Sequence, residues 1–452
     1  MLIEFKVANF RSIREEQTLS FIANSSDELP DNLIVRDLPG LTGAKFLKGI
    51  GIYGANASGK SNLLAALRFL ATFVRDSATN LDPTASTGAE PFKLDSESAA
   101  LPSQFEISAL INDMRILYGL HVTRKRVVNE YLAAYPKGKP QVWFEREWDS
   151  KSEKYEWSKA TPNFKHDDAL REKVRENAAF ISAAAQWNQE QATMVWKWFD
   201  QNLRFLDLSG GILDASLTFD LVKDRDARLR VIKLLRGADL GISDIRVREA
   251  KQKRTFQIKA EISPRTEEDP STQKIAKSED HRDLLELFEK GLRQRFSDVF
   301  NSPILEFLHQ AKGEALVPLN FASEESAGTR RYFAMIGEWL RGQDAGRTVL
   351  VDELESSLHP LLVRELLNLL FAGASNASYM QIVFTTHNPL LLDQSLLRRD
   401  QIWFTEKDQD GATRLYPLTD FKPRRDESLV RGYLAGRYGG IPFIPEGLCS
   451  NG

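Results

Sequence analysis

Gly54-Ala-Asn-Ala-Ser-Gly59-Lys60-Ser61 has the required residue at each fixed position of the phosphate-binding pattern GxxxxGK(S/T). The apolar run from Ile50 to Tyr53 predicts a buried strand before it, and the residues from Asn62 to Arg75 predict a helix after it. A loop in this position presents successive backbone N–H groups and the positive end of a helix to a diphosphate. The stretch therefore predicts an α/β fold with a site for a nucleoside triphosphate.

The side chains of this loop have separate predicted roles. Lys60 is expected to reach the β and γ phosphates, and Ser61 is expected to hold Mg²⁺. A glycine-rich turn between a strand and a helix can also bind nothing, but all the defining positions are present here. The loop residues expected to contact the nucleotide are Asn56, Ser58, Gly59, Lys60, Ser61 and Asn62.

Length, charge and cysteine content exclude several classes of protein. A chain of 452 residues exceeds one ordinary domain of roughly 100–200 residues, so we expect two substructures. The net charge of −3 excludes a globally basic nucleic-acid binder but allows a local basic face. The single Cys449 cannot form an internal disulfide, and no window offers the ~18 apolar residues of a membrane span. We therefore expect a cytoplasmic protein that does not enter the membrane.

A second group of polar residues follows two apolar runs farther along the chain. Thr348-Val-Leu-Val-Asp352-Glu353 predicts a strand that ends in two carboxylates, Asp352 for Mg²⁺ and Glu353 to orient or deprotonate the attacking water. The run from Gln381 to Thr386 predicts another strand. His387 follows it, at the edge where ligands bind in parallel sheets, and is placed to sense the γ phosphate. An acidic pair can simply cap a strand, but the phosphate loop upstream favours chemistry.

Several further segments resemble one branch of the ABC-type ATPases, which contains the SMC, RecF and overcoming-lysogenization proteins. Glu324-Glu325-Ser326-Ala327-Gly328-Thr329, before a helical run, resembles the signature segment of these ATPases. Asn9-Phe10-Arg11-Ser12 resembles their early strand-turn, in which a basic residue approaches the nucleotide phosphates. Ser357-Leu-His-Pro360 resembles the segment that lies against the partner subunit, and residues 421–442 resemble the end of bacterial abortive-infection and restriction-linked ATPases.

This resemblance implies a P-loop NTPase of ABC/SMC-head type, with a mostly parallel central sheet interrupted by an α+β insertion. It also implies ATP and Mg²⁺ as cofactors and Arg11 as a nucleotide-binding residue. Ser326 and Gly328 would complete the site of another copy, which implies a homodimer or higher homo-oligomer with composite ATP sites. The family's magnesium-sensing glutamine has no secure counterpart around residues 89–93.

Changes in residue pattern along the chain predict a divided domain organisation. Residues 1–95 and 300–452 are expected to form a split ABC-type ATPase domain. Residues 96–160 predict an antiparallel β meander, with strand-like runs at 105–111, 116–122 and 141–145. Residues 161–299 predict a mainly helical lobe with an exposed charged loop at 264–280.

The favoured function is that of an ATPase in anti-phage defence. Its nucleotide-dependent dimerisation would sense nucleic acid or a phage component and control a separately encoded, nuclease-like effector. One alternative is a self-contained nuclease of the overcoming-lysogenization type, which disagrees with the 65 residues that follow His387. Another is the ATPase subunit of a transporter, which disagrees with the long insertion and the signature variant.

Two basic stretches, residues 124–126 and 246–254, supply Lys and Arg in rows that phosphate contacts need. Solvated strand and loop faces explain them equally well, so DNA binding stays open. The stretch from Phe421 to Tyr438 combines Arg with aromatic residues. It either docks a partner or packs on the protein's own nucleotide-binding core.

Overall fold

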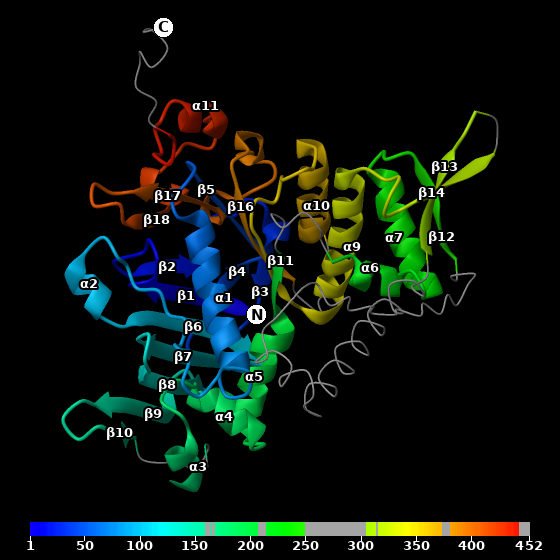
Figure 1. Ribbon diagram of the computed structural model, residues 1–452. Coiled ribbons are helices and arrows are strands. Elements are labelled where there is room, and N and C mark those ends of the chain that lie inside the picture. The colour runs from blue at the N-terminus through cyan, green and yellow to red at the C-terminus, as the bar shows by residue number, and fades with distance from the viewer. Residues whose placement is uncertain are drawn as a thin grey trace, which may run out of the picture. The chain divides into compact units, whose positions relative to one another are not determined.

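The computed structural model describes residues 1–158, 164, 168–206, 214–248, 304–312, 315–372 and 380–442 (Figure 1). The chain forms two compact units. The first contains Met1–Asp214 and Glu338–Gly452, and the second contains Ala215–Gly337. The predicted loop at 264–280 lies outside the described residues. The predicted division into a split domain, a meander and a helical lobe stays a prediction.

A six-stranded sheet forms the centre of the first unit, in the order β11-β15-β16-β5-β17-β18. Neighbouring strands from β11 to β17 are parallel, and only β18 is antiparallel to its neighbour. The predicted mostly parallel central sheet is therefore confirmed. The strands are β5 (Gly49–Gly54), β11 (Leu203–Leu206), β15 (Thr348–Val351), β16 (Gln381–Thr386), β17 (Ile402–Lys407) and β18 (Thr413–Pro417).

The three strands predicted from apolar runs, β5, β15 and β16, lie at or near the centre of this sheet. Every residue of each strand is buried. Parallel strands that are covered on both faces have continuous apolar runs, because neither face meets water; strands with one exposed face alternate apolar and polar residues instead. In the register, Val351 pairs with Phe384, Thr386 with Tyr53, and Thr405 with Gly54. The carboxyl ends of four strands therefore meet at one edge.

Helix α1 (Lys60–Asp76) connects the phosphate loop to the rest of the first unit. Its buried residues recur every three or four positions, which produces one apolar stripe. The helix contacts β5 of the parallel sheet and β1 (Leu2–Ala8) of a second sheet, so both sheets share one core with it (Figure 1). Other helices of this unit are α2 (Ser96–Ala100), α3 (Asp168–Lys173), α4 (Phe180–Gln186), α5 (Glu190–Asn202), α10 (Pro360–Ala372) and α11 (Leu429–Leu434).

The second sheet is antiparallel and has the order β10-β9-β8-β7-β6-β1-β2. The predicted strand-like runs at 105–111, 116–122 and 141–145 are confirmed as parts of β6, β7 and β9. The N-terminal strand pairs with this meander. The remaining strands are β2 (Gln17–Ser20), β6 (Ser103–Ile111), β7 (Met114–Val122), β8 (Val127–Tyr135), β9 (Gln141–Asp149) and β10 (Lys154–Trp157), besides the hairpin of β3 (Leu33–Val35) and β4 (Lys45–Leu47).

The second unit contains a three-stranded antiparallel sheet, β12-β13-β14. Phe307, Phe321 and Phe333 pack their rings with centroids 5.1–5.4 Å apart, which joins this sheet to α9. Helix α9 (Ala327–Ala345) begins in this unit and ends in the first. The other elements are α6 (Ser216–Leu221), α7 (Arg225–Gly237), β12 (Ile242–Arg248), β13 (Ile304–Gln310) and β14 (Leu316–Asn320).

Gln381 fixes the two sheets of the first unit to each other. This fully buried side chain donates to the carbonyl oxygens of Leu2 and Leu47, at 3.0 and 3.2 Å. Its Oε1 accepts from the Leu2 N–H at 2.7 Å and from the Thr348 hydroxyl at 3.2 Å. One amide of β16 thus satisfies polar groups of β1, β4 and β15, which sets the sheets in a fixed relation.

A buried ion pair fixes the meander to α4. Arg146 and Glu130 are both fully buried, with nitrogen and oxygen 2.7 Å apart. The Glu130 carboxylate also accepts from the Tyr118 hydroxyl and from the N–H groups of Phe180 and Ile181, at 2.7–3.1 Å. These hydrogen bonds offset the cost of removing two charges from water.

Glu130→Gln should therefore destabilise the protein by about 3 to 5 kcal/mol, because Arg146 would keep a buried charge without its partner. Urea unfolding followed by circular dichroism measures the change. Asp113→Asn is the control, since its pair with Arg36 is exposed and should contribute at most about 1 kcal/mol. Equal midpoints for the Glu130 variant and the parent would contradict this account.

Candidate functional site

The glycine-rich loop lies between β5 and α1, as predicted. The Lys60 ammonium folds back over the loop and donates to the carbonyl oxygens of Gly54 and Ala55, at 2.8 and 3.0 Å. Gly59 has a φ of 114°, and a Cβ there would lie 2.1 Å from the Thr413 hydroxyl. Only glycine fits this position, for both conformational and steric reasons.

Hydroxyl groups from distant segments of the chain hydrogen-bond to this loop and to the first turn of α1. Ser58 Oγ lies 2.6 Å from Thr405 Oγ1, and the Thr413 hydroxyl donates to the Ser58 carbonyl at 3.0 Å. Ser12 Oγ lies 2.8 Å from Thr413 Oγ1 and accepts from the Asn62 amide at 2.7 Å. The predicted ligands Ser58 and Asn62 are thus joined to three supporting residues that sequence reasoning missed. The only sequence signal for Thr405 is its place near the end of an apolar strand.

The two predicted carboxylates follow β15 and are held by Thr385 of the neighbouring strand. The Thr385 hydroxyl donates to Asp352 Oδ1 at 2.5 Å and accepts from the Glu353 N–H at 2.8 Å. Glu353 has a φ of 51°, in the left-handed region that non-glycine residues seldom adopt. Such strain is typical of residues whose direction matters for function.

His387 lies beside Lys60, with 3.5 Å between Nδ1 and Nζ. Its backbone N–H donates to Oε1 of Glu355 at 2.6 Å. Sequence reasoning missed Glu355, although it lies two positions after Glu353. Burial and the Lys60 charge both lower the pKa of His387. Burial lowers the pKa of Lys60 to about 8, against the opposing effect of Asp352, Glu353 and Glu355. Lys60 therefore lies in a desolvated place where a nearby phosphate would favour the charged ammonium and raise its pKa.

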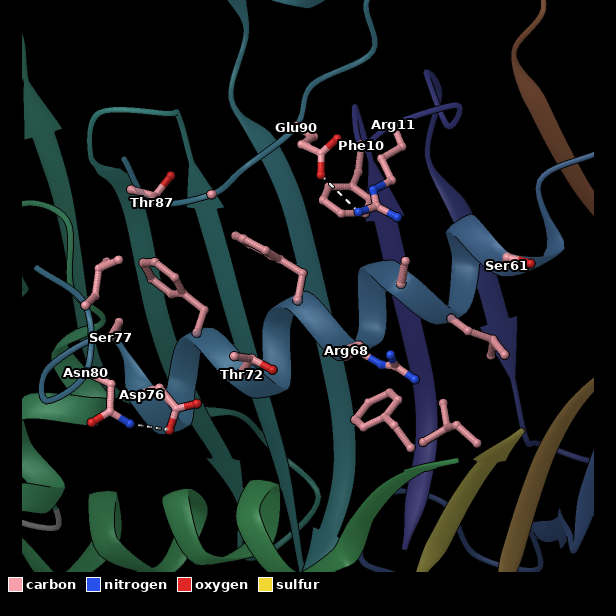
Figure 2. Close-up of a pocket in the computed structure, with 18 of the residues that line it drawn as sticks. Phe10, Arg11, Ser61, Arg68, Thr72, Asp76, Ser77, Asn80, Thr87 and Glu90 are labelled. Atoms are coloured by element: carbon pink, nitrogen blue, oxygen red, sulfur yellow. Dashed lines mark hydrogen bonds and ion pairs between the residues drawn. The ribbon is translucent and has the colours of Figure 1, made fainter. Parts of the chain in front are cut away.

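A cavity of about 670 Å³ begins at the phosphate loop and runs along α1. Figure 2 shows Ser61 at one end of the helix and Asp76 and Asn80 at the other. Ser61 and Asp352, the two predicted magnesium ligands, both line this cavity. A hydroxyl and a carboxylate are the oxygen ligands that suit Mg²⁺ when phosphate oxygens and water complete its shell. Among the described residues, no group of three or more His, Cys, Asp or Glu side chains could hold a metal by itself.

Arg11 lines the same cavity and is paired with Glu90 (Figure 2). The guanidinium lies 2.9 Å from the Glu90 carboxylate, and the Arg11 N–H donates to the Glu90 carbonyl at 2.6 Å. Both side chains are about two-fifths exposed, so the pair can exchange with solvent or ligand. Glu90 lies within the segment where the sequence offered no glutamine. The structure therefore brings Arg11 into the same cavity as Ser61 and Asp352.

The predicted signature residues belong to the second unit. Ser326 is exposed and precedes α9, and its hydroxyl oxygen accepts from the Thr329 N–H at 3.0 Å, as an N-cap does. Gly328 lies in the first turn of the helix. His309 contacts Glu325 at 2.7 Å, and Arg330 donates to the Glu325 carbonyl at 2.9 Å. These contacts hold the segment on β13.

The closing stretch packs on the protein's own core. The ring of Tyr433 stacks on that of Phe404 at 5.6 Å, and its hydroxyl donates to the Gly440 carbonyl at 3.1 Å. A Cβ at Gly440 would lie 3.6 Å from the Gly54 Cα. Of the two interpretations of residues 421–438, this arrangement favours packing on the nucleotide-binding core.

Arg126 and Arg248, from the two basic stretches, have partners within the chain. Arg126 lies 3.0 Å from Glu176 and stacks on Trp148, and Arg248 lies 2.7 Å from Glu306. Residues 249–254 lie outside the described residues. The structure thus accounts for these described arginines without nucleic acid. None of the helices in the described part of the chain is both long and apolar enough to cross a bilayer.

A family model described as "AAA domain, putative AbiEii toxin, Type IV TA system" matches residues 50–393. This range includes the phosphate loop, both carboxylates and His387. The chain belongs to this AAA-domain family. No curated protein matches it.

Two solved structures of SMC heads are similar to this AAA-domain protein. One is the SMC head bound to the C-terminal winged-helix domain of ScpA, with 12% identity, a TM-score of 0.41, and coverage of 92% of this chain and 96% of the other. The second is an SMC head with an extended coiled coil, bound to the C-terminal domain of ScpA from Pyrococcus furiosus. It has 12% identity, a TM-score of 0.38 and coverage of 93% and 97%. The fold itself is defined by the parallel sheet and by the loop between β5 and α1.

Replacing Lys60 of the AAA-domain protein by Met should raise the pKa of His387, because a neighbouring positive charge is removed. In the parent, the pKa of His387 should lie below the ordinary histidine value of about 6.5. In the Lys60 variant, it should lie closer to that value. NMR titration of histidine-labelled parent and variant measures the two pKa values. The His387→Asn variant assigns the His387 signal. Lys93→Met, at an exposed lysine, is the control. A His387 pKa that stays the same without Lys60 would show that the two groups do not interact.

Proposed function

We propose that this protein binds ATP with Mg²⁺, hydrolyses it, and dimerises around the bound nucleotide. The observation that carries the proposal is the convergence of charged groups at one edge of the parallel sheet. Lys60, Glu355 and His387 are joined by contacts of 2.6–3.5 Å, and Thr385 connects Asp352 to Glu353. Phosphoryl transfer needs positioning and charge stabilisation above all, and this cluster supplies both.

Binding uses the loop and the first turn of α1. Backbone N–H groups of the loop and the helix dipole stabilise the phosphates, as at other helix N-termini. The Lys60 ammonium exchanges the carbonyl oxygens of Gly54 and Ala55 for phosphate oxygens. Arg11, in the same cavity, exchanges Glu90 for phosphate in the same way. Ser61 and Asp352, which line the same cavity, would hold Mg²⁺, and the ion would neutralise phosphate charge.

Hydrolysis begins at Glu353. Its carboxylate orients a water molecule and accepts a proton as the water oxygen bonds to the γ phosphorus, while the bond from that phosphorus to the β–γ bridging oxygen breaks. ADP and phosphate are released. Lys60 stabilises the charge that develops on the phosphate oxygens. His387, neutral at pH 7 because of its lowered pKa, can donate one hydrogen bond to the γ phosphate.

A second copy of the chain completes the site. The exposed N-terminus of α9, with Ser326 and Gly328, directs free N–H groups and a helix dipole toward the γ phosphate of the partner's nucleotide. This interaction is lost when the γ phosphate leaves, so ATP holds the dimer and hydrolysis releases it. A homodimer is the smallest assembly that fits, and higher homo-oligomers can repeat the same contact.

We place this cycle in anti-phage defence in the cytoplasm. The description of the matching family names a toxin of a toxin–antitoxin system, which supports a role in such a response. Nucleic acid or a phage component would act as the trigger, and a separately encoded, nuclease-like protein would be the effector. The change between dimer and separate subunits would transmit the signal.

Glu353→Gln should trap the dimer with ATP and lower kcat by a factor of about 10² to 10⁴, the usual contribution of a general base. The amide can still orient water but cannot accept its proton. Size-exclusion chromatography with light scattering, and phosphate release, measure the two effects. Glu365→Gln, on the exposed face of α10, is the matched control. A Glu353 variant that stays monomeric with ATP would contradict its role as the base.

Ser326→Arg should leave ATP binding by the monomer nearly unchanged but abolish hydrolysis and ATP-dependent dimerisation. The larger, charged side chain would block the N-terminus of α9 from the partner's γ phosphate. Isothermal titration with a non-hydrolysable ATP analogue measures binding. Ser323→Arg, at another exposed serine before the helix, is the control. If the Ser326 variant hydrolysed ATP as fast as the parent, the composite-site model would be wrong.

A further inference from the structure

Glu355 occupies a position between the ends of three strands. It follows β15, its Oε1 accepts from the backbone N–H of His387 after β16, and its charge acts on Tyr53 near the end of β5. Its Oε2 is buried and has no hydrogen-bond partner among the described residues. A buried carboxylate oxygen without a partner is costly, so its retention needs a reason beyond capping a strand.

Tyr53 presents a second buried polar atom in the same region. The side chain is fully buried, and within the described part of the chain its hydroxyl finds no hydrogen-bond partner. Tyr53 directly precedes Gly54, the first residue of the phosphate loop. Its ring packs against those of Phe404 and Tyr433, with centroids 6.1 and 6.3 Å away. The Tyr53 hydroxyl and Glu355 Oε2 are therefore two buried polar atoms near the ends of β5 and β15 that hydrophobic packing does not explain.

The contact of Glu355 with His387 has a direct geometric consequence. A hydrogen bond of 2.6 Å from a backbone N–H to a carboxylate is a strong, charge-assisted one. It fixes the backbone of His387 just where the chain leaves β16, and therefore the origin of its side chain. The imidazole then lies beside the Lys60 ammonium, at 3.5 Å. Loss of the carboxylate would release the histidine from this place.

We propose that Glu355 is a positioning residue for ATP hydrolysis, whose carboxylate fixes His387 so that the imidazole faces the γ phosphate beside Lys60. This role depends on the proposed function. Glu355 does not touch the reacting atoms and acts through the histidine. It is the third acidic residue after β15, following Asp352, the proposed metal ligand, and Glu353, the proposed base. Its own role is to position His387.

Two variants test the kinetic role. Glu355→Ala removes the acceptor and should lower kcat about 10²-fold, the usual effect of misplacing a catalytic group by about 1 Å, with ATP affinity within about threefold of the parent. Glu355→Gln keeps an oxygen for the His387 N–H and should restore at least a tenth of the parent kcat. Glu365→Gln is again the control. A purely structural role would lower the unfolding midpoint and leave the kcat of the folded protein unchanged, which would overturn the proposal.

A measurement without turnover separates this inference from the proposed function. Protein with ¹⁵N-labelled histidine gives few amide signals, since the chain has six histidines, and His387→Asn assigns the relevant one. The strong hydrogen bond should hold that signal downfield in the parent. It should move upfield in Glu355→Ala and much less in Glu355→Gln. An unmoved signal in Glu355→Ala would refute the positioning role, even if the parent protein did not hydrolyse ATP at all.

Discussion

The register of the parallel sheet is the constraint on which the site depends. Because Thr386 pairs with Tyr53 and Val351 with Phe384, the polar residues that follow three strands emerge at one edge. Side chains alternate between the two faces of a strand, so a shift of one residue would place each of them on the wrong face. The buried amide of Gln381 resists that shift, since it satisfies backbone groups of a second sheet only in this register.

Burial at this edge gives the site its electrostatic character. Lys60 is nine-tenths or more buried and rests on two carbonyl oxygens, and its pKa falls to about 8. His387 is kept neutral by the same desolvation and by the lysine. A triphosphate would place negative charge beside the Lys60 ammonium, which would favour the protonated lysine and raise its pKa again. The loop is thus preorganised for an anion.

The sequence alone was sufficient for elements with local signals. The phosphate loop, the central strands and the helix after the loop each follow from a continuous pattern, and the structure confirms these elements. The residues that support the loop were not predictable in this way. Thr405 and Thr413 lie about 350 positions from Ser58, and Glu90 lies 79 positions from Arg11. Such pairs are defined by sheet order and by the course of the chain, for which a single sequence has no local pattern.

Glu355 was also not predictable from the sequence, although it lies only two positions after Glu353. A carboxylate two positions after Glu353 resembles any solvated acidic residue, and only the pairing of β15 with β16 places it against the His387 N–H. The closing stretch is a parallel case, since the ring of Tyr433 reaches Tyr53 across more than three hundred residues of chain. The phosphate loop is therefore local in sequence, but the hydroxyl groups that hold it come from Ser12 near the start of the chain and from Thr405 and Thr413 far beyond the loop. The backbone of Gly440 lies next to Gly54, so the closing stretch of the chain borders the first residue of the loop.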